Sequence, residues 1–340
     1  MRVAVTGASG NVGSALLREL GSRGHDVIAV ARRVPDGLQD VEDADIASVR
    51  WHAADVGRDN LDPALEGCDA LVHLAWMFQP THDPDRTWEA NAVGTRRALH
   101  SAARSRVPIV ISASSIAAYS PAVDDEPVDE TWPTDGPSSA AYCREKAYAE
   151  RLLDALEAER PDLRVVRMRP AFVFQRSAAS EQRRIFGAPA LRPWMLDRRF
   201  IPAVPVPQGL RLQAVHTGDL ARAYAQALER PVHGAFNIAA DDVLRREDLG
   251  RILDARTAEV PRRLVRAAVE AAWRARLVGA PGDLYDALMR LPVMSTARAK
   301  EELGWQPQHS AADALEAMIS GARSGAGSGM PPLHPDPTFP

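Results

Sequence analysis

Cysteine is scarce in this chain of 340 residues, which contains only Cys68 and Cys143. The two cysteines form no closely spaced pair, so the sequence indicates neither a disulfide framework nor a zinc site. We therefore expect no metal and a reducing, cytoplasmic location. No apolar run approaches the roughly 20 residues that cross a bilayer. Met1 leads directly into an apolar run, so we expect neither a signal peptide nor membrane association.

An excess of charge of one sign is also missing. The formal net charge is −4, and charged residues make up 25% of the chain. This balance gives no electrostatic footprint for nucleic acid. Hydrophobic residues make up 46%, which is typical of a globular protein. We expect a small-molecule substrate and no nucleic-acid partner.

A glycine-rich turn near the start of the chain is the strongest local signal. Residues 6–13 read TGASGNVG, between an apolar run long enough for a buried strand and a helical pattern. In a phosphate-binding turn the first glycine allows the tight bend, the second admits a pyrophosphate, and the third lets the helix pack on the strand. The first helical amides then point at the anion. The residues that we expect to contact a dinucleotide here are Gly7, Gly10, Asn11, Val12 and Gly13.

Strand and helix patterns alternate through the first half of the chain. This alternation predicts an α/β fold with a Rossmann-type, doubly wound parallel sheet and helices on both faces. The strands that follow the first one are expected at 26–30, 50–54, 69–75, 108–112 and 163–168, with long helices at 85–105 and 138–159.

The pattern changes after Pro170, where the chain becomes rich in arginine and proline. Order returns with a strand at 212–215, a helix at 218–229 capped by Thr217, and a strand at 235–238. We expect the following organisation: a Rossmann domain over 1–170 completed by parts of 211–240, a smaller C-terminal α/β substrate domain over 171–320, and a Gly/Ser/Pro-rich tail over 321–340 that buries no core.

Tyr142 and Lys146 lie four residues apart on an expected helix, so both face the same way. A free tyrosine has a pKa of about 10, and a nearby ammonium group stabilises its phenolate. Tyr142 could then exchange a proton with a hydroxyl or a carbonyl group. Ser115 follows the strand at 108–112, at the edge of a parallel sheet where ligands bind, and could hold a substrate oxygen.

Nine motifs in order make the chain resemble the extended short-chain dehydrogenases, the NAD-dependent epimerase/dehydratase family, over roughly residues 1–320. They are Thr6-Gly7-x-x-Gly10-x-x-Gly13, Asp55, His73-Leu74-Ala75, Asn91-x-x-Gly94-Thr95, Ser114-Ser115-x-x-x-Tyr119, Tyr142-x-x-x-Lys146, Arg169-Pro170, Val215-His216-x-x-Asp219 and Leu303-Gly304-Trp305-x-Pro307.

The resemblance implies a Ser-Tyr-Lys catalytic set. Tyr142 would be the acid/base, Lys146 would lower its pKa and hold the nicotinamide ribose, and Ser115 would orient the substrate oxygen. The resemblance also implies a homodimer formed by the helices at 86–106 and 138–160. The further cofactor contacts that it implies are Asp55, Val56, Leu74, Ala75, Pro170 and Val173.

Departures from the family pattern bear on the cofactor and the substrate. Arg32 and Arg33 stand where family members that use NAD usually carry an acidic residue, and arginine there suits a 2′-phosphate, so we expect NADP to be favoured over NAD. Ala171 and Leu212 occupy two places where members that bind nucleotide sugars usually carry an asparagine and an arginine. The apolar substrate contacts that we expect are Trp76, Met77, Phe78 and Phe172.

Three functions remain open from the sequence. The first is an oxidoreductase that transfers a hydride at a secondary alcohol or ketone of a small, partly apolar substrate. The second is a nucleotide-sugar epimerase, for which arginines such as Arg183, Arg184, Arg192 and Arg211 could grip a phosphate. The third is a non-catalytic NADP-binding sensor, against which the Tyr/Lys pair counts.

Overall fold

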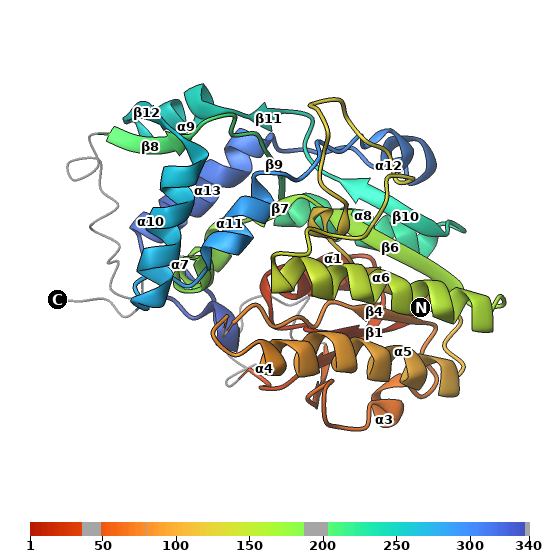
Figure 1. Cartoon of the computed structure of the whole chain (residues 1–340). Coiled ribbons are helices and arrows are strands. Elements are labelled where there is room, and N and C mark those ends of the chain that lie inside the picture. The colour runs from red at the N-terminus through yellow and green to blue at the C-terminus, as the bar shows by residue number, and fades with distance from the viewer. Residues whose placement is uncertain (36–48, 80, 187–202, 337–340) are drawn as a thin grey trace.

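The computed structural model describes residues 1–35, 49–79, 81–186 and 203–336. A large sheet with its flanking helices occupies one side of the molecule (Figure 1). Most of the elements that follow residue 240, drawn in blue-green and blue, gather on the other side. None of the helices in these ranges is long and apolar enough to span a membrane.

The large sheet is parallel and has seven strands in the order β10-β6-β5-β4-β1-β2-β3. Chain order reverses between β1 and β4, which makes that point the switch where ligands bind in such sheets. The predicted Rossmann-type α/β fold is confirmed. The strands are β1 (Arg2–Thr6), β2 (Asp26–Ala31), β3 (Arg50–Ala53), β4 (Ala70–His73), β5 (Ile109–Ala113), β6 (Arg164–Pro170) and β10 (Gly234–Ile238).

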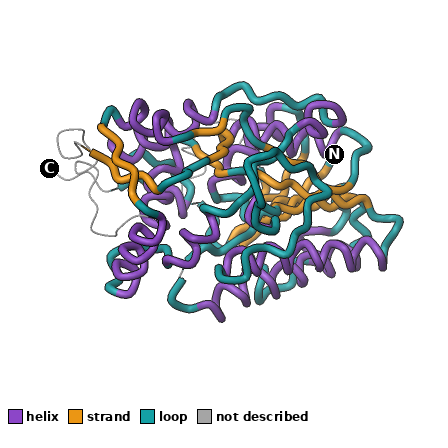
Figure 2. Tube along the Cα trace, turned by 45° about the horizontal axis from the view of Figure 1, so that its top comes forward, coloured by secondary structure: helices purple, strands orange, loops and turns teal. Residues whose placement is uncertain are grey.

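Helices cover both faces of this sheet, as the tube view also shows (Figure 2). On one face α1 (Asn11–Ser22) packs against α8 (Thr217–Glu229), and Leu16 and Tyr224 are buried in the core between them and the sheet. On the other face, α5 (Gly94–Arg104) contacts α6 (Ala141–Glu159) and the short α3 (Asp62–Leu65). Each fully buried leucine in such a core contributes about 1.5–3 kcal/mol.

The expected long helix at 85–105 is present but contains a change of winding. It runs as α4 (Pro84–Trp88), a π-helical turn (Glu89–Val93) and α5. The π turn presents Asn91 toward the loop that follows β4, because the Asn91 amide bonds both the N–H (2.6 Å) and the carbonyl oxygen (2.8 Å) of Met77. π turns of this kind are frequent at functional sites.

Most of the remaining described elements form a smaller α/β assembly beside the large sheet, whereas α12 (Ala297–Glu302) contacts β10 of the large sheet. One sheet has the order β11-β9-β7, so β9 pairs with β7 and stands outside the large sheet. A second, two-stranded sheet joins β12 to β8. The elements of this assembly are β7 (Phe172–Phe174), α7 (Ala179–Phe186), β8 (Ala203–Pro207), β9 (Leu212–His216), β11 (Val243–Leu244), α9 (Arg246–Leu253), β12 (Arg256–Val260), α10 (Arg262–Arg274), α11 (Gly282–Leu288) and α13 (Ala311–Arg323).

The expectation that the segment after residue 321 buries no core is wrong. The helix α13 continues to Arg323, and a 3-10 turn (Pro331–Leu333) follows it. Met330 is 5% exposed and Leu333 is fully buried, and both belong to the same core cluster as α1. Composition predicted a solvated tail, but two apolar side chains are enough to dock it.

Candidate functional site

The glycine-rich turn has the geometry of a phosphate cradle. Gly7 has a φ of +69°, and a Cβ there would lie 2.7 Å from the backbone nitrogen of Ala75. A Cβ on Gly13 would lie 2.3 Å from the carbonyl oxygen of Gly7. The helix can therefore pack this closely on the turn only if residue 13 is glycine. Gly10 caps α1 without any side-chain hydrogen bond, which leaves the first N–H groups of the helix available for an anion.

A cavity of about 360 Å³ opens above this turn, along the carboxyl ends of the parallel strands. It brings together every residue that the sequence predicts to contact the cofactor. These residues are Gly7, Gly10, Asn11, Val12, Gly13, Arg32, Arg33, Asp55, Val56, Leu74, Ala75, Tyr142, Lys146, Pro170 and Val173.

The cavity also has walls that the sequence reasoning missed. The first group lies at strand ends, in the glycine-rich turn (Ser9) and in the π turn (Ala90), and the strand-end members could have been predicted from their position at the edge of a parallel sheet. The second group comes from α7, α8 and the 3-10 turn near residue 332, where no local pattern indicates a ligand. The first group is Ser9, Val30, Ala31, Ala54, Ala90, Ala113 and Ser114. The second group is Glu181, Leu220, Tyr224 and Pro332.

Ser115, Tyr142 and Lys146 meet at one end of this cavity. The Tyr142 hydroxyl donates to the Oγ of Ser115 at 3.3 Å, and that Oγ also accepts the backbone N–H of Ala117 at 3.1 Å. The Lys146 ammonium donates to the carbonyl oxygen of Ala113 at 2.8 Å. Ser115 itself is buried and does not line the cavity, so its hydroxyl reaches this space through Tyr142.

Burial governs the protonation of this set. It raises the pKa of Tyr142 to about 12, although the hydrogen bond with Ser115 acts in the opposite direction. Burial also lowers the pKa of Lys146 to about 7, opposed by the charges of Glu150 and Glu145. Lys146 is not among the groups that act on the Tyr142 pKa here, and the lowering of this pKa by Lys146 and a bound nicotinamide stays a prediction. The ammonium lies 3.4 Å from the ring centroid of Trp76 and bonds a carbonyl group instead of stabilising a phenolate.

A family model described as "NAD dependent epimerase/dehydratase family" matches residues 3–239. The chain belongs to this family. Its relatives include enzymes such as epimerases and reductases, and this chain is an enzyme that carries their Rossmann-type, NAD-binding fold.

The similar proteins differ in how much of their length the chain matches. An uncharacterized protein of Mycobacterium tuberculosis is 25% identical over 97% of this chain and 31% of its own length. A 4-hydroxy-2-methyl-3-oxo-4-farnesyl-3,4-dihydroquinoline-1-oxide ketoreductase of Stigmatella aurantiaca is 31% identical over 51% of each chain. The chain thus spans about a third to a half of the length of the curated relatives it matches.

A solved structure of the family shares the fold of this chain over nearly its whole length. The UDP-glucose 4-epimerase of Thermotoga maritima, with UDP-glucose, matches with a TM-score of 0.71 and 20% identity. The match covers 95% of this chain and 99% of that chain. At this level of identity the likeness concerns the architecture, so the substrate of this family member has to be argued from its own side chains.

Aromatic side chains from the loop after β4 surround Tyr142 in this family member. The Trp76 ring meets Tyr142 edge-on at 6.0 Å between centroids, and the Phe78 ring lies 4.9 Å from Tyr142. Phe78 also contacts Phe186 of α7 at 4.8 Å. The predicted residues Trp76, Met77 and Phe78 all line the main cavity.

Phe172 is the fourth residue that the sequence predicts to contact the substrate, and this contact stays a prediction. Phe172 does not line the main cavity, and its ring packs against Phe174 with the centroids 6.2 Å apart. Successive side chains of a strand point to opposite faces. Since Val173 faces the cavity, both of its neighbours on β7 lie on the other face of the strand. Phe172 packs there against the core of the smaller sheet and also against the cluster to which Tyr142 and Phe78 belong.

A second, smaller cavity of about 50 Å³ adjoins Tyr142 on the side away from the glycine turn. Its walls are mostly apolar. Glu145 is the one charged side chain among its lining residues, and Thr87 (2.8 Å) and Asn91 (2.7 Å) donate hydrogen bonds to its carboxylate. The residues that line it are Met77, Phe78, Thr81, Pro84, Thr87, Ala141, Tyr142, Glu145, Pro281 and Leu284.

The arginines considered for a phosphate grip have other partners. Asp336 pairs with Arg183 at 2.7 Å and with Arg184 at 3.1 Å. Arg211 pairs with Asp125 and donates to two backbone carbonyl groups. Arg192 lies outside the described residues.

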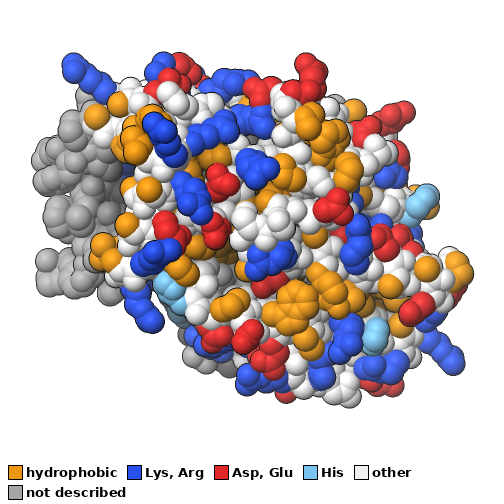
Figure 3. Space-filling model, in the orientation of Figure 1, with side chains coloured by type: hydrophobic (Ala, Val, Ile, Leu, Met, Phe, Trp, Pro, Cys, Tyr) orange, Lys and Arg blue, Asp and Glu red, His pale blue; other side chains and the backbone are white. Residues whose placement is uncertain are grey.

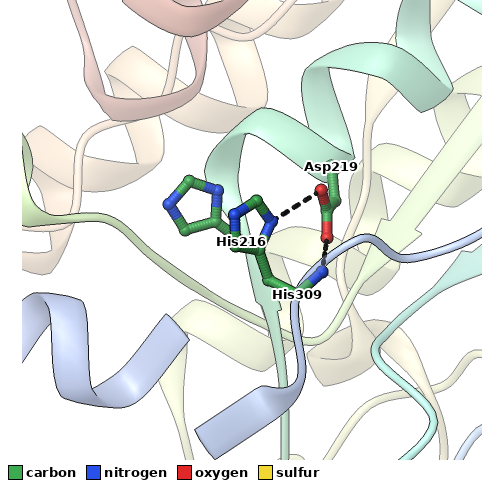
Figure 4. A group of neighbouring side chains, drawn as sticks. All are labelled: His216, Asp219 and His309. Atoms are coloured by element: carbon green, nitrogen blue, oxygen red, sulfur yellow. Dashed lines mark hydrogen bonds and ion pairs between the residues drawn. The ribbon is translucent and has the colours of Figure 1, made fainter. Parts of the chain in front are cut away.

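His216, Asp219 and His309 lie together where α8 begins (Figure 4). The Asp219 carboxylate accepts hydrogen bonds from the Arg222 guanidinium, the His309 ring at 3.1 Å and the His309 backbone N–H at 2.9 Å. The His216 ring accepts the backbone N–H of Gly218 at 3.2 Å, so His216 caps the helix and the expected Thr217 cap is wrong. With a guanidinium already on the carboxylate, these contacts indicate a structural role for the cluster.

Proposed function

We propose that this enzyme transfers a hydride between NADP(H) and a secondary alcohol or ketone of a small, partly apolar molecule. The observation that carries the proposal is the Tyr142–Ser115 hydroxyl pair. Tyr142 lines both the main cavity and the small, mostly apolar cavity, and Ser115 lies behind it at 3.3 Å. The proposal also draws on the family membership of the chain and on its likeness to a ketoreductase.

The protonation state of Tyr142 suits the reduction of a carbonyl group. With a pKa of about 12 the phenol keeps its proton at neutral pH, so Tyr142 can donate it to a substrate oxygen. Ser115 would orient the Tyr142 hydroxyl through the hydrogen bond that joins them. A bound nicotinamide would supply or accept the hydride. Reduction leaves Tyr142 as a phenolate, and oxidation starts from the same phenolate. In both directions Lys146 would need to approach Tyr142 to stabilise it, which requires Trp76 to leave the ammonium group.

The charges at the end of β2 favour a cofactor with a 2′-phosphate. Arg32 and Arg33 are exposed and line the cavity directly after the strand. Asp26 lies at the opposite end of β2, about 16 Å away at the usual rise per residue. There it pairs with Arg2 and Arg50. Asp26 therefore cannot bind the adenosine ribose.

The substrate end of the site favours a molecule without phosphate groups. A buried diphosphate needs cationic or amide donors. The arginines described above are already paired, and the small cavity offers a single carboxylate. A nucleotide-sugar epimerase is the alternative, because the fold of this chain is that of the UDP-glucose 4-epimerase.

A substrate screen separates the two functions. NADPH oxidation is followed with a panel of neutral aliphatic and aromatic ketones, and C4 epimerisation of UDP-, GDP- and dTDP-sugars is followed by NMR, each with Tyr142→Phe as the matched control. We expect ketone-dependent turnover that this variant loses. Epimerisation of a nucleotide sugar, lost in the same variant, would overturn the proposal in favour of the alternative.

We also propose a homodimer formed by the helical face of α5 and α6. Trp88 at the end of α4 and Tyr148 of α6 lie beside this face with their rings tilted and their centroids 4.9 Å apart, and they are 42% and 37% exposed. Hydrophobic side chains gather on the surface over these helices (Figure 3). A contiguous exposed apolar patch is typical of a protein interface, and this patch supports the proposal.

A further inference from the structure

The segment 325–336, which follows α13, folds into a closed loop. Gly325 has a φ of +62°, and the Asp336 backbone N–H donates to the Gly325 carbonyl oxygen at 3.1 Å. Inside this closure the Ser328 N–H donates to the Leu333 carbonyl oxygen at 2.7 Å. A Cβ on Gly327 would lie 2.3 Å from that same oxygen, so the glycines allow the chain to turn back on itself. The segment thus has a defined shape despite its polar, glycine-rich composition.

Two kinds of contact hold the loop on the protein. Met330 and Leu333 insert into the core cluster that includes α1 and α8. The Asp336 carboxylate, whose side chain is 10% exposed, pairs with the guanidinium groups of Arg183 and Arg184 on α7. The Arg184 guanidinium also donates to the carbonyl oxygens of the segment at residues 332 and 334, at 3.1 and 3.2 Å. An arginine pair on one aspartate is a charge-assisted contact, stronger than neutral hydrogen bonds.

This attachment places Pro332 in the wall of the main cavity. The same cavity is lined by Gly10 and Asn11 of the phosphate cradle and by Glu181 of α7. The segment contacts α7, beside which it lies in Figure 1. A ligand that fills the cavity therefore touches the cradle, α7 and the segment together.

We propose that residues 330–336 are part of the cofactor site, with Pro332 packing against the bound dinucleotide and the Asp336–arginine pairs retaining it. This inference rests on the proposed function, since it needs a dinucleotide in the main cavity. Release of the dinucleotide then requires the ion pairs to open and the segment to loosen. The glycines at 325, 327 and 329 provide the hinge.

The test compares Asp336→Asn with Asp162→Asn. Both changes remove the charge of an aspartate that is ion-paired with arginine, and both keep the size of the side chain. Asp162, however, pairs with Arg160 in the connection before β6, at the amino edge of the sheet. The dissociation rate of NADPH is measured by stopped-flow fluorescence after mixing with excess NADP⁺. Asp336→Asn should release NADPH faster by about tenfold, which corresponds to the loss of one charge-assisted hydrogen bond. Asp162→Asn should release it at the wild-type rate.

Limited proteolysis provides a second readout on the unaltered protein. Cleavage within residues 325–329, identified by mass spectrometry, should slow severalfold when NADPH saturates the wild-type protein. Thermal unfolding without cofactor shows whether Asp336→Asn folds like the wild type. If it does not, Pro332→Ala, which keeps the ion pairs and removes contact area, replaces it in the dissociation assay.

The outcomes separate this inference from the proposed function. If the wild type binds NADPH but the folded variants release it at the wild-type rate, the segment is only a structural cover and the inference is wrong. NADPH binding without any change in proteolysis of the segment leads to the same conclusion. If the wild type binds neither NADPH nor NADH, the proposed function fails and the inference fails with it.

Discussion

Removing the arginines at the end of β2 should change which dinucleotide the enzyme prefers. A hydrogen bond to a charged group contributes about 1.5–3 kcal/mol, or roughly ten- to a hundredfold in affinity. Arg32 and Arg33 are exposed, so solvent screening places each of them toward the lower end of this range. We therefore expect the wild type to bind NADPH at least about tenfold more tightly than NADH.

The double variant Arg32→Ala/Arg33→Ala should lose most of this preference. Because NADH lacks the 2′-phosphate, its Kd should stay within about twofold while the Kd of NADPH rises tenfold or more. Raising the salt concentration should weaken NADPH binding to the wild type and have little effect on the double variant, since screening acts on exposed charges within a Debye length of about 10 Å.

Calorimetric titration of both cofactors into each protein measures these effects. Arg274→Ala is the control for removing an exposed arginine elsewhere: it removes one positive charge, against two in the double variant, from a side chain of α10 that is 75% exposed and does not line the cavity. Equal losses of NADPH and NADH affinity in the double variant would refute the reasoning. So would a wild-type preference for NADH.

Four further outcomes test other parts of the structure. Tyr142→Phe should keep its NADPH affinity and lose roughly 10²-fold or more in turnover, as measured on the substrate found by the screen; near wild-type turnover would contradict its role. Burial lowers the pKa of Lys146 to about 7. Between pH 7 and 9 the unfolded chain therefore carries a proton on Lys146 that the folded protein lacks. The free energy of unfolding should rise with pH in this range by up to about 1.4 kcal/mol per pH unit. In urea titrations, Lys146→Met should lack this rise of the unfolding free energy with pH. Above pH 9 the raised pKa of Cys143, about 12, lowers the unfolding free energy as the pH rises and opposes the effect of Lys146. Trp88→Glu should convert a dimer into monomers in light scattering, whereas an unchanged mass would exclude this face as the interface. Trp305→Phe removes a fully buried indole whose N–H donates to the Asp219 carbonyl oxygen at 2.8 Å. The variant should lose about 1–3 kcal/mol of unfolding free energy. A Tm within one degree of the wild-type value would contradict this expectation.

Local patterns in the sequence were sufficient for the large sheet and for many of the residues that line the main cavity. The glycines at 7, 10 and 13 indicate a turn that packs closely against neighbouring backbone. At Gly7 and Gly13 a Cβ would lie within 2.7 Å of backbone atoms, so no other residue fits there. Alternating strand and helix patterns predict parallel strands, and the carboxyl ends of parallel strands meet at one edge. Residues that follow different strands, such as Arg32, Asp55 and Leu74, therefore line one cavity.

Only the tertiary structure decided the surroundings of those residues. Burial depends on what packs over a side chain, so the high pKa of Tyr142 and the position of Trp76 over Lys146 have no sequence signature. Phe172 faces the smaller sheet because β7 pairs with β9, a choice between strands that are far apart in the chain. Pro332 reaches the cavity because two apolar side chains and one carboxylate find partners on α1, α8 and α7. Because such contacts join segments that are far apart in the chain, composition alone predicted a solvated tail for the segment 325–336.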